Sequence, residues 1–182
     1  TDSVRKEIRE NKNIKRFHSI ALKPGMLKNK TYFEGVLFKG VSSNFDWSSL
    51  DTLLTEGKFP DLSNTISKEI LISETLARQL DLKVGDQTDT YFQNQFNQGR
   101  PKKRRFTVSG IYFSGFPDID QTLLYGDLRQ IQKINRWEEN MIGGYELFVK
   151  DFSLIQNTTD QIYNGIPSEL NSIPIFDRFP SI

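Results

Sequence analysis

The segment Glu69–Asp86 constrains the fold most, because three secondary-structure elements follow one another there with almost no slack. The short apolar run Ile70–Ile72 predicts a buried strand. Ser73 predicts the start of a helix, since its hydroxyl oxygen can accept hydrogen bonds from the first free backbone N–H groups. Leu76 and Leu80 lie four positions apart and would share one face of that helix. A Val-Gly-Asp turn closes the segment, and none of its residues forms a nucleophile, a ligand set or a phosphate-binding loop. We therefore expect it to serve structure rather than chemistry.

The rest of the chain alternates helical and strand patterns in an irregular order. Pro24-Gly25 predicts a turn after the first strand, and the strand can resume at Met26-Leu27. Hairpins and helical crossovers are mixed, which favours the α+β class over a doubly wound sheet. Helices are expected at residues 2–10 and 46–55, after Ser73, after Asp127, and from Asp151 to about 164. Strands are expected at residues 14–22, 31–41, 70–72, 87–92, 106–113, 121–125 and 145–149.

Composition excludes several classes of protein. The 182 residues carry 24 Lys and Arg against 23 Asp and Glu, whereas a general nucleic-acid binder is usually strongly basic. The absence of cysteine excludes disulfides, thiolate zinc sites and thiol catalysis. No run approaches the roughly 20 apolar residues that span a bilayer, and the charged first residues do not form a secretory signal. The abrupt ends lead us to expect a piece of a longer protein.

Individual polar residues give little support for an active site. His18 is the one histidine of the sequence, so a Ser-His-Asp site would have to use it, and a lone histidine in a strand is more often a packed residue. Asp118 and Asp120 could hold a divalent cation, but the further ligands of a calcium-binding loop are missing. We expect no catalytic residue, cofactor or metal.

Segments between Gly35 and Ile182 match, in order, the motifs of one family. Leu71–Asp86 is similar to the “ISxxLAxxLxLxxGD” segment of the extracytoplasmic core domain of FtsX-like ABC transporter permeases, the group that includes MacB, and Phe106–Ile111 is similar to the strand that follows it. Two further segments, Gly115–Tyr125 and Gly144–Asp151, resemble the lipoprotein-releasing permeases LolC and LolE more closely than MacB. Upstream, Gly35–Val41 and Glu56–Asp61 also resemble segments of that family, while Arg178–Ile182 resembles the stretch before the second transmembrane helix.

The resemblance implies a fold and a place in the cell. The fold would be a two-lobed MacB-like periplasmic core, with a Porter-like lobe from residues 1–66 and 144–182 and an inserted Sabre-like lobe from residues 67–143. The chain would be the large loop between transmembrane helices one and two of an integral membrane protein. It would lie on the periplasmic face of the bacterial inner membrane.

The resemblance also implies a function without chemistry in this domain. A separate cytoplasmic ATPase and a second permease subunit would complete the machine. The domain would couple ATP hydrolysis to the extraction of acylated lipoproteins and their transfer to a LolA-like periplasmic chaperone. Two alternatives stay open: a MacB-like efflux permease domain that docks a periplasmic adaptor, and an FtsX-like regulator of a cell-wall hydrolase.

The loop expected at residues 93–105 holds the strongest run of basic residues. In LolC the corresponding loop is a hook that grips the chaperone, so the resemblance implies a partner-binding site here. Its residues would be Gln95, Phe96, Arg100, Pro101, Lys102 and Lys103, with Phe96 as the apolar anchor and the basic residues facing an acidic rim. A solvated hairpin tip and a nucleic-acid contact are the alternatives.

Overall fold

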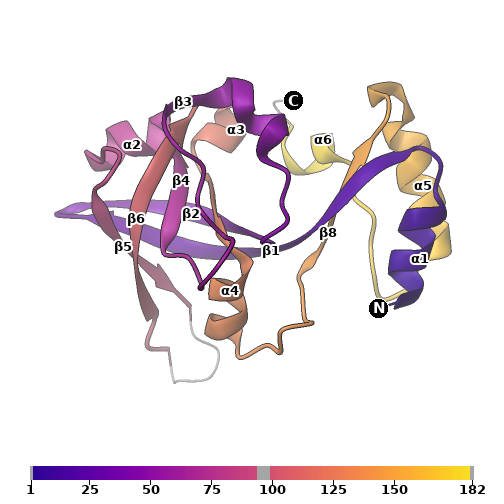
Figure 1. Ribbon diagram of the computed structural model, residues 1–182, viewed down its shortest axis with the longest axis horizontal. Coiled ribbons are helices and arrows are strands. Elements are labelled where there is room, and N and C mark those ends of the chain that lie inside the picture. Colours follow the sequence, from indigo (N-terminus) through magenta and orange to yellow (C-terminus); the bar gives the residue numbers. More distant parts are fainter. Residues whose placement is uncertain (1, 94–98, 181–182) are drawn as a thin grey trace. The chain divides into compact units, whose positions relative to one another are not determined.

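The computed structural model describes residues 2–93 and 99–180, and its elements are labelled in Figure 1. The chain divides into two compact units. Unit 1 comprises Thr1–His18 and Tyr145–Ile182, and unit 2 comprises Ser19–Gly144. Both contain helices and strands, so the expected α+β class is confirmed.

The boundaries of these units differ from those of the lobes expected from the resemblance, residues 1–66 with 144–182 and residues 67–143. The first boundary interrupts strand β1 (Ile14–Asn29), whereas the last lies close to the expected one. The assignment of Porter-like and Sabre-like lobes therefore stays a prediction. Among the described residues, none of the helices is both long and apolar enough to cross a bilayer.

Six strands of unit 2 close into a barrel, as counted over the residues that the structure describes. Their order around the ring is β1-β2-β7-β4-β6-β5, and β5 pairs with β1 again. The pairs β2·β7 and β4·β6 are parallel, and the other four are antiparallel. Strand β3 adds to β6 outside the ring. Besides β1, the bounds are β2 (Tyr32–Val41), β3 (Leu54–Gly57), β4 (Glu69–Ser73), β5 (Gln87–Phe92), β6 (Lys102–Tyr112) and β7 (Leu123–Asp127).

The hydrophobic core of unit 2 consists of inward-facing strand residues and the apolar faces of two helices, α2 and α4. Phe38 lies at its centre, with ring centroids 5.7 Å from Phe92 and 5.3 Å from Phe106. Gly126 allows this arrangement, because a Cβ there would lie 2.4 Å from the tip of the Phe38 ring. The helical segments of unit 2 are η1 (Trp47–Leu53), α2 (Glu74–Leu80), α3 (Pro117–Asp120) and α4 (Leu128–Asn135).

The segment Glu69–Asp86 folds as expected. Ser73 caps α2 by accepting a hydrogen bond from the Leu76 amide at 3.0 Å, and its hydroxyl donates to the carbonyl of Asp120. Leu76 and Leu80 are fully buried on the inner face of the helix. The segment thus connects a central strand, a core helix and the next strand, which confirms its structural role.

The turn expected at Pro24-Gly25 is wrong, because β1 continues through both residues. Pro24 faces Leu37 of β2, and the Leu37 amide donates to Thr122 at 2.8 Å, on the side away from β1. The two residues therefore form a pair without mutual hydrogen bonds, and the missing N–H of Pro24 points away from β2. Because β5 begins to pair with β1 only at Gly25, the proline interrupts no ladder bond.

The helix expected at residues 46–55 is only partly formed. Asp46 does cap a helical segment, accepting from the Ser48 amide at 3.0 Å, but that segment is a 3₁₀ helix that ends at Leu53. Leu54 begins strand β3, and the Thr55 hydroxyl donates to the carbonyl of Ile111 at 3.2 Å. Pairing with β6 thus overrides the local helical pattern.

A buried ionic cluster fixes the loop that precedes β4. The Asp127 carboxylate accepts from the amides of Ser67 and Arg129 at 2.8 and 2.9 Å, so it caps α4 as the sequence predicts. The Arg129 guanidinium binds that carboxylate at 2.7 Å and also donates to the carbonyls of Leu62, Asn64 and Thr65. Hydrogen bonding to Asp127 raises the pKa of Arg129. One charged pair therefore holds the loop, the helix start and β7 together.

Unit 1 packs two helices on a pair of strands. Helix α1 buries Val4 and Ile8 on one face, as their spacing predicts, and Ile162 of α5 completes this small core. Asp151 accepts from the Ser153 amide at 2.8 Å and so starts the helical segment expected there. The elements are α1 (Asp2–Glu10), the first part of β1, β8 (Gly144–Val149), η2 (Phe152–Leu154), α5 (Ile155–Gly165) and α6 (Ile175–Arg178).

Candidate partner-binding site

The candidate site lies at the hairpin of β5 and β6. The two strands pair antiparallel, from Gln87 opposite Thr107 to Phe92 opposite Lys102. Successive side chains of β5 alternate between the barrel interior and its outer surface. Thr88, Thr90 and Phe92 are buried, whereas Gln87, Asp89 and Tyr91 lie outside. The register with β5 therefore decides which basic residues of β6 lie on the outer surface.

The structure separates the six residues predicted for the hook. Gln95 and Phe96 lie outside the described residues. Arg100 and Pro101 are exposed immediately before β6. Lys102 and Lys103 belong to β6, so the expectation of a loop that extends to residue 105 is wrong. The physical reason is the register with β5, which continues the ladder through the whole basic run.

Lys102 points away from the outer surface of the hairpin and toward α4. Its ammonium donates to the carbonyl of Ile134 at 2.8 Å, at the end of α4, where backbone carbonyls lack partners within the helix. Burial lowers the pKa of Lys102, and the charges of Arg136 and Arg104 lower it further. Lys23 binds the Asn135 side chain nearby at 2.7 Å. Lys102 thus serves the packing of α4.

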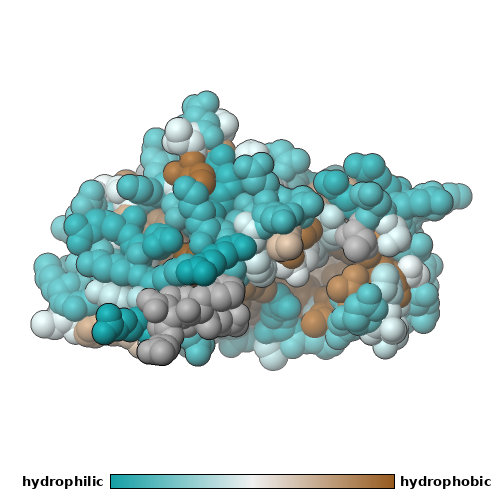
Figure 2. Space-filling model, turned by 90° about the horizontal axis from the view of Figure 1, so that it is seen from below, coloured by the Kyte–Doolittle hydropathy of each residue, from teal (hydrophilic) through white to brown (hydrophobic). Residues whose placement is uncertain are grey.

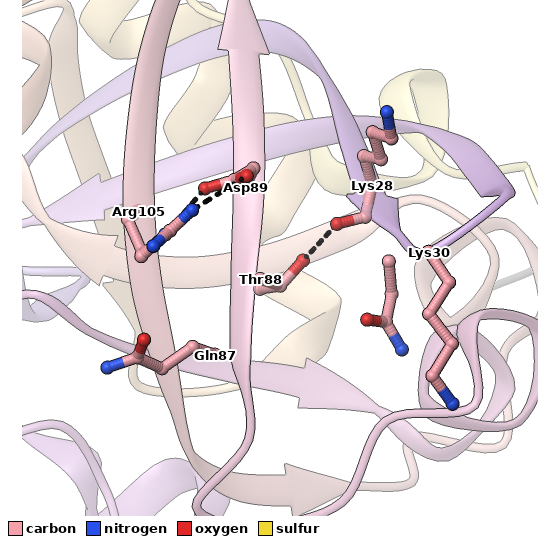
Figure 3. A pocket seen from close by; sticks show the side chains of 7 residues that line it. Lys28, Lys30, Gln87, Thr88, Asp89 and Arg105 are labelled. Carbon is pink, nitrogen blue, oxygen red and sulfur yellow. Dashed lines mark hydrogen bonds and ion pairs between the residues drawn. The ribbon is translucent and has the colours of Figure 1, made fainter.

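Lys103 and Arg105 lie on the outer surface and share one carboxylate. Arg105 donates to both oxygens of Asp89, at 2.9 and 3.2 Å, and the Lys103 ammonium lies 2.8 Å from Oδ2. Figure 3 shows Arg105 reaching across from β6 to Asp89 on β5. The hydrogen bond from Arg105, aided by Lys103, lowers the pKa of Asp89 to about 2. Asp89 is therefore a charged acceptor at neutral pH, and it neutralises part of the basic run.

A small polar pocket of about 280 Å³ adjoins this ion cluster. Thr88 and Lys28 both line the pocket, and the Thr88 hydroxyl donates to the carbonyl of Lys28 at 2.9 Å (Figure 3). The pocket offers charge and hydrogen bonds but no nucleophile paired with a base. Its lining residues are Lys28, Asn29, Lys30, Gln87, Thr88, Asp89 and Arg105.

The other polar residues considered from the sequence have structural surroundings. The His18 ring is 8% exposed and packs edge-on against Phe148, with centroids 5.7 Å apart. Asp120 is buried and accepts from the amides of Ser114 and Gly115, which uses its carboxylate to form the turn. Within the described ranges, no three His, Asp or Glu side chains are grouped closely enough to hold a metal ion.

Sequence reasoning missed the outer side of β5. The alternation of Asp89 and Tyr91 with Thr88, Thr90 and Phe92 marked one face of a strand as polar. The sequence did not show which residues of other strands lie beside that face, because β1 and β6, which pair with β5, are far from it or separated by a loop in the chain. The face of the molecule that Figure 2 shows is mostly hydrophilic, with hydrophobic residues gathered over part of it.

Comparison with known proteins identifies the fold. No protein-family model matches the chain, and no curated protein matches it. Among solved structures, the extracellular domain of the noncanonic ABC-type transporter YknZ from Gram-positive bacteria is similar. It is 15% identical, with a TM-score of 0.56, and the match covers 90% of this chain and 79% of that one. The periplasmic region of MacB from Actinobacillus actinomycetemcomitans is 13% identical, with a TM-score of 0.52 over 90% of this chain and 72% of that one.

These similarities show the fold alone, because the identities are low. The chain has the mixed α+β fold of extracytoplasmic domains from MacB-like ABC transporters, with a six-stranded barrel among its described residues. MacB, which the family resemblance names, is one of these two structures.

Proposed function

We propose that this chain is the extracytoplasmic domain of a MacB-like ABC transporter permease. The observation that supports it is the match over 90% of the chain to two such domains, each with a TM-score above 0.5. On this proposal the domain carries out no chemistry. A cytoplasmic ATPase subunit and a second permease subunit would supply the energy and complete the membrane assembly.

Within that class we propose the lipoprotein-releasing type. The ordered motifs from Gly35 to Asp151 support this choice, since four of them resemble LolC and LolE. The domain would help to lift acylated lipoproteins from the inner membrane and to pass them to a LolA-like chaperone. The chaperone contact would involve Gln95, Phe96, Arg100, Pro101 and Lys103 but not Lys102, which binds the end of α4, and the exposure of Arg100 and Pro101 immediately before β6 supports it.

A second candidate is a MacB-like domain that docks a periplasmic adaptor. The fold similarity to MacB and YknZ favours it as much as it favours the first candidate. Arg100 and Lys103 would then meet an adaptor rather than a chaperone.

Copurification and depletion of the full-length protein separate these candidates. An affinity tag on the protein in its native membrane should recover an ATPase subunit, and a protease added from outside the inner membrane should cleave this domain. Failure of both results would refute the permease proposal. Depletion should then trap lipoproteins in the inner membrane. Normal lipoprotein sorting together with loss of efflux would support the adaptor-docking candidate instead.

The proposed chaperone contact has its own test. An Arg100→Glu and Lys103→Glu double variant of the full-length protein should reduce crosslinking to the chaperone, because both side chains are exposed cations. Lys102→Gln is the matched control, since Lys102 binds the end of α4. Equal crosslinking by the double variant and the wild type would exclude this contact.

A further inference from the structure

The outer surface of four neighbouring strands in unit 2 carries aromatic, apolar and cationic side chains in two rows. One row crosses the strands as Phe33, Lys28, Asp89 and Arg105, and the other as Gly35, Met26, Tyr91 and Lys103. Because directly opposed residues of paired strands share a face, all eight lie on one side of the sheet. We call this surface the basic–aromatic face.

Two apolar side chains on this face are about half exposed. Phe33 is 50% exposed and Met26 is 48% exposed. Gly35 faces Met26 on the neighbouring strand, and a Cβ built there would meet no atom within 4 Å. Packing within the chain therefore does not require glycine at this position, and the space beside the methionine is open. Two half-exposed apolar side chains on one face, with open space beside the methionine, offer a partner's side chain a surface to cover.

Charge gives the chemistry of that partner. The two rows hold the cations Lys28, Lys103 and Arg105 and one carboxylate, Asp89, so the face has an excess of two positive charges although the whole chain has only one. The Lys28 ammonium lies 4.9 Å from the centre of the Phe33 ring, and the Lys103 ammonium lies 6.0 Å from that of Tyr91. Cations thus stand next to each aromatic ring, where a ligand carboxylate beside an apolar side chain would meet both.

We propose that the basic–aromatic face binds a polypeptide segment of a partner protein in which acidic residues flank an apolar side chain. The apolar side chain would lie over Met26 in the open space beside Gly35, and the carboxylates would meet Lys28, Lys103 and Arg105. Asp89 argues for a peptide over a lipid surface, because a peptide places its charges beside the cations only, whereas a sheet of phosphates would also meet this carboxylate. The inference concerns unit 2 alone and stands whether or not the chain belongs to a permease.

A peptide titration tests the proposal on the 182-residue chain. The probe is a fluorescent synthetic peptide of alternating Glu and Leu with one central Phe, and its matched control replaces every Glu by Gln. We expect saturable binding of the acidic peptide, with amide NMR shifts in β1, β2 and β5, and at least about tenfold weaker binding of the Gln peptide. Equal binding of the two peptides, or no binding of the acidic one, would overturn the proposal.

Gly35→Gln separates binding from folding. The added side chain has open space and is compatible with a strand, so the melting temperature should not fall, whereas the affinity for the acidic peptide should drop about tenfold. Gly144→Gln is the matched control, since Gly144 also has open space but lies on β8. Unchanged peptide affinity in Gly35→Gln would refute the assigned surface.

Two further measurements identify a different occupant. Sedimentation of the wild-type chain tests self-association, and flotation with vesicles of phosphatidylglycerol and phosphatidylcholine tests lipid binding. A dimer or a vesicle-bound state that Gly35→Gln abolishes would overturn the peptide proposal, because the face would then serve a second copy or a membrane. A monomer that does not float with the vesicles but binds the acidic peptide would support the peptide proposal.

Discussion

The two aspartate–arginine clusters of unit 2 use the same chemistry in different surroundings. The Asp127 side chain is 2% exposed and Arg129 is 31% exposed, whereas Asp89 is 19% and Arg105 is 60% exposed. Arg129 also donates to three backbone carbonyls, whereas Arg105 donates to the two oxygens of Asp89. The comparison suggests that the inner cluster determines the structure of a loop, while the outer cluster displays charge that a partner can use.

The largest expected effect is that of Arg129→Ala. It removes the cation beside buried Asp127 and leaves three loop carbonyls without their donor, so the free energy of unfolding should fall by about 3 kcal/mol. Urea denaturation monitored by tryptophan fluorescence measures this. Arg129→Lys keeps the charge but not the planar guanidinium, so its free energy of unfolding should lie between those of the wild type and the alanine variant. A loss below about 1 kcal/mol for Arg129→Ala would show that the inner cluster does not hold the loop.

The outer cluster should contribute through the pH dependence of stability. The pKa of Asp89 is lowered from 3.8 to about 2, so its stabilisation is complete above pH 3.8 and is lost as the pH falls through about 2. Solvent screens the exposed partners, so we expect Asp89→Asn to lower the free energy of unfolding at neutral pH by about 1 kcal/mol. Between pH 3.8 and about 2, the stability of Asp89→Asn should also decline less than that of the wild type. Denaturation curves at several pH values measure both effects, and parallel profiles would contradict them.

Arg105→Ala should have a smaller effect on stability than either of these. Lys103 still binds Asp89, and the arginine is mostly exposed, so the melting temperature should fall by no more than about 2 °C. The pKa of Asp89 should nevertheless rise, since the hydrogen bond from Arg105 is the main cause of its low value. A carboxyl NMR titration measures this shift. A melting-temperature loss as large as that of Arg129→Ala would remove the distinction between the two clusters.

The smallest effect is expected for Lys30→Ala. Lys30 pairs with Asp81 at 2.9 Å, but the side chains are 67% and 62% exposed. Such pairs contribute little because water and salt screen them. Alanine keeps the Cβ and hence the backbone strain of the left-handed conformation at this position, so thermal unfolding should not change measurably. A clear destabilisation would mean that this hairpin tip is tied to α2 more firmly than its exposure indicates.

Local patterns predicted the elements whose determinants are close in sequence. Ser73 and Asp127 cap helices from within the same few residues, and Val4 and Ile8 face one core from adjacent turns. Strand pairing decided the remaining elements. Leu54 is part of a strand because it pairs with β6. Pro24 lies within β1 because no hydrogen bond to β2 requires a backbone N–H at that position.

The candidate site was less predictable for the same reason. Lys102 and Lys103 are equal in sequence terms, yet one binds the end of α4 and the other faces outward. That difference depends on the register between β5 and β6. The sequence alone does not show that Met26 and Phe33 lie on the same face as the cations, because that depends on the pairing of β1 with β2 and β5.

The closed ring of strands has a consequence for how the chain reaches its native state. Closure requires Leu37 of β2 to meet Leu123 of β7, so contacts distant in sequence must form before the core is complete. Folding rates fall as such long-range pairing increases, because the entropy of closing the intervening chain is lost first. Unit 2 should therefore fold slowly for its size, on a timescale of roughly milliseconds to seconds.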